Sequence, residues 1–491
     1  MLKIISKIRH CAFINVFMCF AFITFFTYIF LISLFERELI NPFKINGGFE
    51  ADKSEAINSN EYLKNSILSI FIIFSISLFC GHLFLYINVP PLVAYLIVGI
   101  IIQNIDAIRK SFVVNDYFIE IIRLLSVITI AVKVAYNMHH LHLQKHWKTA
   151  LIISLPSTII GCIWITLLTH LYFEIPLLLS ICYGLIIGVS APPIIGNVAE
   201  FIRTRKLEDK HEVNQIIGLA ASMDNMFCIV CMNIFMDYLN DKEQYHLLIT
   251  FGHLVSGFII GLCIGAFVWV FPSNKELLFF ASTRTFMCFI ATVGLVYYFK
   301  FKLWTSTATI AAIVLSFISA IKFRIDAGIG KKPVEQIYLD NIWNYILEPF
   351  LFTFEGYYFV FCDFSLKTIG ICLLIIISAV IIKTYCTFFF SIHTELKFKE
   401  RILVSLATTP RSTVQVANSM LILNLGHNNI FNASVESCKN LYATVVLCLL
   451  LTNGLTQIIL KIAASRLLKS NTSIVPNDYA NMKDIVNNNK A

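Results

Sequence analysis

The apolar stretches of this 491-residue sequence leave few folds open to it. Stretches of about 20 residues with hardly any charge recur along the chain, and each has the length of a helix that crosses a lipid bilayer. Hydrophobic residues make up 57% of the sequence and charged residues only 14%, whereas soluble proteins carry about a quarter charged residues. The mean hydropathy of +0.76 agrees with this contrast. The sequence therefore predicts an all-α membrane protein that crosses the bilayer many times, because helices satisfy their own backbone hydrogen bonds in lipid.

We expect about fourteen transmembrane helices, each of about 20 residues. The first runs from about residue 11 to residue 35, after Lys3, Lys7 and Arg9. It is longer than the apolar segment of a signal peptide and no small-residue cleavage site follows it, so we expect the protein to retain it. The other predicted spans lie near residues 65–87, 89–106, 117–138, 149–173, 176–198, 213–238, 246–271, 277–299, 303–322, 340–361, 366–391, 402–424 and 437–466.

The basic loops support this count. If the N-terminus is cytoplasmic, Lys145–Lys148, Arg203–Lys206, Lys331-Lys332 and Lys397–Arg401 all fall on the inner side, as short basic loops of membrane proteins do. The sequon at Asn432 then falls on the outer side and is a candidate glycosylation site.

The chain divides into three predicted parts. Residues 1–64 hold the first span and an outside loop, residues 65–466 form the main membrane domain, and residues 467–491 are a polar, Asn-rich cytoplasmic tail that we expect to be disordered. We expect an integral, multi-pass protein of the plasma membrane or of an organelle membrane, since no sorting signal in the sequence separates the two.

Two polar features interrupt the apolar background between Gly188 and Asn225. Ser190-Ala191 is followed by Pro192 and Pro193, which remove two backbone donors and should break a helix. Asp224 and Asn225 lie in the middle of the next apolar stretch. An acid at membrane depth is costly and indicates a functional site, and a broken helix beside such an acid is typical of the ion sites of secondary transporters.

Five stretches resemble one family in order and spacing. They are Val89–Ile101 with its Pro-Pro-Leu, Gly188–Pro192, Ala220–Asn225, Glu348–Phe352 and Thr409–Gln415. Together they resemble the NHA-type sodium/proton antiporters of the cation/proton antiporter superfamily, the solute carrier 9 subfamily B. The resemblance covers about residues 65–466. It implies two inverted repeats of membrane helices whose unwound helices cross at mid-membrane, and we expect the two breaks at Ser190–Pro193 and at Glu348-Pro349.

The resemblance also assigns the ion site. Asp224 would bind Na⁺ or Li⁺ and exchange it for protons, with oxygens from Asn225 and the Ser190 region completing the site. The family has a second aspartate where this chain has Asn225, which offers a carbonyl oxygen but cannot change its protonation state. From the residues alone, Asp224 could instead be only the buried partner of a basic residue.

Three further charged residues belong to the predicted site. Lys383 and Arg411 lie inside predicted spans, where by register the family has an arginine and a lysine. We expect them to pair with acids near the site and to stabilise the ends of the crossed helices, and the alternative for each is a static salt bridge. The family acid of the second broken span falls at Tyr358 here. Glu355, about one helical turn away, is a candidate replacement. The alternative for Glu355 is a side chain that only faces a cavity.

The histidines of one inner loop invite a metal-site interpretation. His139, His140, His142 and His146 have no cysteine beside them and lie in a basic loop, so a solvated, pH-sensing loop is the favoured interpretation.

The predicted function is secondary active antiport of Na⁺ or Li⁺ against H⁺ by alternating access. The alternative is a degenerate relative that keeps the fold without transport and acts as a structural or regulatory membrane protein, for which Asn225 is the argument. The sequence contains no nucleophile–base pair, no H-E-x-x-H and no phosphate-binding loop, so we expect neither an enzyme nor a cofactor, and no metal beyond the transported ion. The expected partners are membrane lipid and a second copy of the chain in a homodimer, but no nucleic acid.

Overall fold

The structure is a computed structural model that describes most of residues 53–468. The residues between these ends that it does not describe are 88, 110–111, 113, 206, 208–211, 241–246, 273–279, 303, 329–330, 412 and 420–434. Within residues 11–35, the predicted first span, it describes only Met18, Ala21, Phe22, Phe25, Phe26 and Ile29. The sequon at Asn432 and the tail from residue 470 therefore lie outside the described residues.

The described part of the chain is built from helices and contains no strand, as the composition predicts. The elements are α3 (Lys53–Tyr86), α4 (Pro91–Asn104), α5 (Asp106–Arg109), α6 (Asp116–Asn137), α7 (His140–Phe173), α8 (Leu177–Gly188), α9 (Pro192–Thr204), α10 (Val213–Asn240), α11 (Leu247–Val270), α12 (Phe280–Phe301), α13 (Thr305–Ala327), α14 (Val334–Ile342), η1 (Trp343–Leu347), α15 (Glu348–Tyr357), η2 (Phe361–Asp363), α16 (Leu366–Ser391), α17 (Phe398–Ala407) and α19 (Val435–Leu467). Residues 413–419 are also helical. In the described chain, 8 helices are long and apolar enough to cross a membrane, and Ser69–Leu85 and Pro91–Asn104 are shorter apolar helices. The prediction of an integral, multi-pass membrane protein is confirmed.

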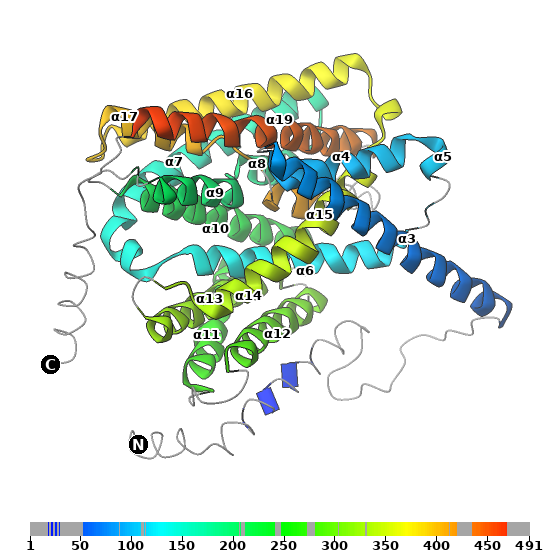
Figure 1. The fold of residues 1–491 in the computed structure, drawn as a ribbon, viewed down its shortest axis with the longest axis horizontal. Helices are drawn as coiled ribbons and strands as arrows, with labels where there is room; N and C mark the ends of the chain where they lie inside the picture. The colour runs from blue at the N-terminus through cyan, green and yellow to red at the C-terminus, as the bar shows by residue number, and fades with distance from the viewer. Residues whose placement is uncertain are drawn as a thin grey trace.

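The helices around the site form two groups: the first is α11–α13, and the second comprises α7–α10, α16, α17 and α19. Figure 1 shows α11, α12 and α13 on one side of the molecule, α16, α17 and α19 on the opposite side, and α7 to α10 between them. The rings of Phe22 and Phe267 stack at 4.7 Å, so the described residues of the N-terminal segment pack against α11.

Two successions of helices repeat in the second group. The first is α7, the broken pair α8 and α9, and then α10. The second is α16, then α17 with the broken continuation through residues 413–419, and then α19. Helices α7 and α16 pack on each other, and α9 packs on both α10 and α19. This order agrees with the predicted inverted repeats.

The second break is not where we expected it. Pro349 lies in a helix that continues from Val334 to Tyr357 through a π-helical turn at Trp343–Leu347. A wider turn relieves the clash between a proline ring and the carbonyl four residues earlier, so this helix absorbs its proline without unwinding. The chain instead leaves the helical conformation at residues 408–411, between α17 and the helix at 413–419.

Helices α4 and α15 touch through glycines. A Cβ atom on Gly99 would lie 1.9 Å from the Thr353 carbonyl oxygen, and one on Gly356 would lie 2.1 Å from that of Leu96. Only glycine permits this approach, as in other membrane helices that meet through small residues. The contact fixes the position of α15, and with it that of Glu355.

Asp237 ties α10 to α13. Its carboxylate is buried and accepts hydrogen bonds from the backbone N–H and the hydroxyl group of both Thr305 and Ser306, which begin α13. It therefore satisfies donors that every helix leaves free at its N-terminus.

Glu212, before α10, ties the start of α10 to the first turns of α7. It accepts hydrogen bonds from Lys145 at 2.5 Å and from His146 at 2.8 Å. Burial opposes the ionisation of Glu212, but the bonds from Lys145 and His146 outweigh it and lower the pKa of the carboxyl group below its ordinary value.

Candidate ion-binding site

Two non-helical segments meet among α7–α10, α16, α17 and α19. The first, Val189–Ala191, separates α8 from α9, because the two prolines that follow can begin a helix but cannot continue one. The second comprises residues 408–411. The Ala191 N–H donates to the Pro410 carbonyl at 2.8 Å, and the Ser190 hydroxyl group donates to the Thr408 carbonyl at 3.3 Å.

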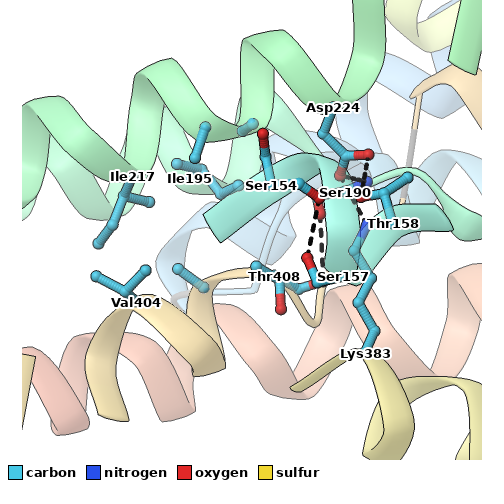
Figure 2. A pocket seen from close by; sticks show the side chains of 13 residues that line it. Ser154, Ser157, Thr158, Ser190, Ile195, Ile217, Asp224, Lys383, Val404 and Thr408 are labelled. Carbon is cyan, nitrogen blue, oxygen red and sulfur yellow. Dashed lines mark hydrogen bonds and ion pairs between the residues drawn. The ribbon is translucent and has the colours of Figure 1, made fainter. Parts of the chain in front are cut away.

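Asp224 of α10 lies beside this crossing and is 2% exposed. Its Oδ1 accepts a hydrogen bond from the Thr158 hydroxyl group of α7 at 2.7 Å. Its Oδ2 accepts from the Ser190 backbone N–H at 3.0 Å and from Lys383 Nζ at 2.7 Å. Figure 2 shows these groups converging on the carboxylate from three different elements.

Lys383 of α16 is the charged partner of Asp224. It is 1% exposed, and its ammonium group also donates to the Gly188 carbonyl at the end of α8. A buried ion pair with good geometry is held by strong Coulomb attraction, but removing one member leaves a costly unpaired charge. Any cation that binds Asp224 must therefore compete with this ammonium group.

Asn225 lies next to Asp224 and faces the first extended segment. Its Nδ2 donates to the Ser190 carbonyl at 3.0 Å and to the Ala221 carbonyl at 2.7 Å. Its Oδ1 is buried and accepts no hydrogen bond from any described residue. The amide thus fixes the unwound backbone while it leaves one oxygen free for a ligand.

A cavity of about 10 Å³, room for about one water-sized particle, adjoins the carboxylate. Hydroxyl groups of α7 line one side of it, and Figure 2 shows those of Ser154, Ser157 and Thr158 near Asp224. A carboxylate surrounded by hydroxyl and carbonyl oxygens suits a small hard cation.

A second cavity, of about 230 Å³, lies beside the junction of α6 and α7, which we expect on the inner side. Asn137, His139 and His142 line its mouth, while Ile195 and Ala221 line both this cavity and the smaller one beside Asp224. A single layer of apolar side chains therefore separates the site from the inner cavity. Burial and the nearby Arg324 lower the pKa of His139 to about 3, so this ring is neutral and does not repel cations.

Arg411 lies at the crossing without joining the ion pair. Its Nη1 donates to the carbonyls of Thr408 at 2.5 Å and Pro410 at 3.3 Å, and the described residues give it no carboxylate partner. It satisfies the carbonyls of the second non-helical segment, while Lys383 supplies the positive charge at Asp224.

The structure does not bring Glu355 to this site. Its carboxylate contacts Ser419, on the helix at 413–419, and it pairs with neither Lys383 nor Arg411. Lys383 balances the charge of Asp224, and Glu355 lies away from this pair.

Sequence reasoning missed Thr158 and Gln415. Thr158 binds Asp224 directly, and Gln415 Nε2 donates to the Val189 carbonyl at 2.7 Å. The only signal for Thr158 is that Ser154, Ser157 and Thr158 share one face of α7 at helical spacing.

Comparisons with known proteins were made for the whole chain. The sequence pattern of the family described as "Sodium/hydrogen exchanger, transmembrane" matches residues 70–465. Sodium/hydrogen exchanger 9B2 of Homo sapiens is 21% identical over 382 residues, which cover 77% of this chain and 70% of the relative. Sodium/hydrogen exchanger 9B1 of Homo sapiens is 20% identical over 366 residues, which cover 73% of this chain and 70% of the relative.

A solved structure shows the same fold. The sodium proton antiporter MjNhaP1 of Methanocaldococcus jannaschii at pH 8 superposes with a TM-score of 0.64 and 16% identity, covering 83% of this chain and 98% of the other.

Proposed function

The chain belongs to the transmembrane sodium/hydrogen exchanger family, and on that premise we propose that it exchanges a monovalent cation, Na⁺ or Li⁺, for protons across a membrane. The observation that carries the proposal is the buried Asp224–Lys383 pair at the crossing of two unwound segments. Asp224 is the proposed cation ligand, assisted by the free Asn225 oxygen and by oxygens near Ser190. The protein is a transporter and not an enzyme.

Competition between the cation and Lys383 couples the two fluxes. A cation at Asp224 weakens the attraction that keeps the Lys383 side chain charged, and a buried lysine without an anionic partner loses its proton. When the cation leaves, Lys383 takes up a proton and pairs with Asp224 again. Cation and proton thus occupy the site in turn.

The charge count follows from Asn225. Without a cation, Asp224 and protonated Lys383 sum to zero. With a cation and neutral Lys383, the site again sums to zero. Because Asn225 cannot bind a proton, one proton is exchanged for one monovalent cation, and the cycle moves no net charge.

Access alternates across the apolar layer between the two cavities. The larger cavity lies on the side that we expect to be the inner one, with Ile195 and Ala221 between that cavity and Asp224. Opening this layer gives the cation a path from the inside, and the outer side opens in the other half of the cycle.

The degenerate alternative has no support from the site. A chain without transport has no use for a fully buried Asp–Lys pair, which is costly to keep in lipid. The present pair is complete, with donors from Thr158 and Ser190 in place.

We infer further that the protein acts as a homodimer surrounded by lipid. The group α11–α13 lies away from the ion site and exposes large apolar side chains such as Phe251, Phe258 and Ile259 of α11. Cross-linking of the protein in vesicles should give a dimer, and a monomer at all lipid ratios would contradict this inference.

Proton flux in reconstituted vesicles tests the function. A pH-sensitive dye inside the vesicles should report flux when Na⁺ or Li⁺ is added. We expect Asp224→Asn to abolish this flux. The matched control is Asp237→Asn, which changes an equally buried acid of the same helix that does not face the site, and it should keep the flux. No cation-driven flux in the wild type, or undiminished flux in Asp224→Asn, would refute the proposal.

A further inference from the structure

A second buried carboxylate, Glu355, lies in the outer half of the membrane domain. Helix α15 ends at Tyr357, and the hydroxyl group of Tyr358 donates to Asp116 at the start of α6. Because we expect the basic stretch Lys145–Lys148, at the start of α7, on the inner side, the start of α6 falls on the outer side. Glu355, two residues before the end of α15, is therefore near the outer face.

The surroundings of Glu355 leave half of its carboxylate unsatisfied. The side chain is 2% exposed, and Oε2 accepts a hydrogen bond from the Ser419 hydroxyl group at 2.6 Å. Oε1 is buried and has no hydrogen-bond partner in the part of the chain that the structure describes. A cavity of about 10 Å³ lies between Glu355, Arg123 and the apolar residues Ile119, Ile122 and Val416, with room for about one water molecule.

Among the described residues, no cation pairs with Glu355. The nearest one, Arg123 of α6, pairs with Glu120 at 2.6 Å and donates to the Ala417 carbonyl at 3.3 Å. From α19, Tyr442 donates its hydroxyl hydrogen to the Glu355 backbone carbonyl. From the helix at 413–419 only the uncharged Ser419 reaches it. A buried carboxylate with one hydrogen bond and no paired cation is stable only when it is protonated.

One short helix connects Glu355 with the ion site. At the inner end of residues 413–419, Gln415 holds the Val189 carbonyl, next to Ser190 at Asp224. Four residues further on, Ser419 holds Glu355. At 1.5 Å per residue this is about 6 Å along the helix axis. Glu355 thus lies about one helical turn outward from the crossing.

On the outer side, Arg123 and Glu120 continue the series of polar groups. The Arg123 side chain is 9% exposed and that of Glu120 is 36% exposed, so Glu120 meets solvent. Polar groups therefore extend from solvent, past a water-sized cavity, to Glu355 and on to the crossing, through an otherwise apolar part of the protein.

We propose that Glu355 is a proton-binding residue on the outer side of the ion site, through which protons pass between the outside and the Lys383–Asp224 pair. This inference rests on the proposed function. The Glu355 carboxylate takes a proton from water on the outer side and becomes neutral. It releases the same proton to the Lys383 amine when the cation leaves Asp224 to the outside. The proton is passed on, so the exchange ratio stays at one to one.

Sided transport measurements test the proposal. Right-side-out vesicles expose the outer face to the bath, and everted vesicles expose the inner face. Glu355→Gln keeps an oxygen for Ser419 but cannot bind a proton. We expect it to lower exchange by about a hundredfold and to remove the dependence on outer pH, while the dependence on inner pH is kept. Glu355→Asp should restore the outer pH dependence. Glu348→Gln, at the other acid of α15, is the matched control and should leave the outer pH dependence as in the wild type.

Infrared difference spectroscopy provides a readout that needs no transport. Raising the pH should remove a carboxylic C=O band in the wild type, and Glu355→Gln should lack that band. If Glu355→Gln does not fold, Glu355→Asp should shift the band instead. The inference would be overturned if the same carboxylic C=O band were still present in Glu355→Gln. It would also be overturned if Glu355→Gln kept the outer pH dependence of the wild type. A wild type without cation-driven flux would instead refute the proposed function.

Discussion

Substitution of Asn225 by aspartate should change how many charges the protein moves in one cycle. In the wild type, Asn225 Nδ2 donates to the carbonyls of Ser190 and Ala221 at 3.0 and 2.7 Å. An aspartate side chain in Asn225→Asp would face these two carbonyl oxygens and lie next to Asp224. It would keep a proton until a cation arrives, because an ionised group there would be repelled from both directions.

The size of the effect follows from the charge count. Each cation entering Asn225→Asp displaces two protons, one from Lys383 and one from the introduced carboxyl group, so one net charge crosses the membrane per cycle. A membrane potential of about 100 mV acts on one charge with about 2.3 kcal/mol. This corresponds to about a 50-fold change in the Na⁺ ratio at which net flux stops. In the wild type the same potential should leave that ratio unchanged.

The assay sets the potential in vesicles with a potassium gradient and valinomycin. The Na⁺ ratio at zero net flux is then measured at fixed pH inside and outside, for the wild type and for Asn225→Asp. A wild-type ratio that shifts with the potential would show that a second proton moves and would refute the charge count. A ratio in Asn225→Asp that ignores the potential would refute the role given to Asn225.

Four further changes have predictable outcomes. Lys383→Met leaves a buried carboxylate unpaired and should lower the free energy of unfolding by about 3–5 kcal/mol, which is measured as a lower Tm. Adding Asp224→Asn removes the unpaired charge and should largely restore the Tm. Asp237→Asn weakens the start of α13 and should cost about 1–3 kcal/mol in the same melting assay. Gly99→Ala should reduce the yield of folded protein by size-exclusion chromatography, because its Cβ would meet a backbone oxygen at 1.9 Å, whereas Gly454→Ala, with open space around it, should not. Glu212→Gln should lose up to about 1 kcal/mol at neutral pH. Since folding lowers the pKa of Glu212, this Tm difference should begin to shrink as pH falls through about 4, the ordinary range of a glutamate, and should vanish only below the lowered pKa of the folded state.

The fold could be predicted from the sequence because a lipid bilayer permits few backbone structures. Long apolar stretches can only become helices in a bilayer, and the inner-side basic loops constrain their order. The same restriction draws attention to Asp224 and Lys383, because a charge in an apolar span requires a partner. The structure places the two 2.7 Å apart although 159 residues separate them.

The location of the second break could not be predicted from prolines alone. Pro349 and Pro410 both disturb a helix, and sequence does not say how each disturbance is absorbed. A π-helical turn accommodates Pro349 within a continuous helix. The backbone around Pro410 is instead non-helical, and its carbonyl groups accept hydrogen bonds from Ser190 and Ala191. Such partners exist only after the two repeats have met.

The uncharged residues of the site also could not be predicted from the sequence. Thr158 resembles the many hydroxyl residues that bond to their own helix, as Thr166 and Thr169 do in the same helix. Only the folded position of α7 beside α10 distinguishes it.

The hydrogen bonds at the crossing determine how the Asp224 site can move during alternating access. Ala191 is joined to Pro410, Ser190 to Thr408, and Gln415 to Val189. In lipid no water can replace these partners, so drawing the two segments apart would strand several polar groups at once. The pocket around Asp224 therefore moves as one rigid unit. It is not taken apart on one side of the membrane and rebuilt on the other. The boundary that moves then lies between this group of helices and α11–α13.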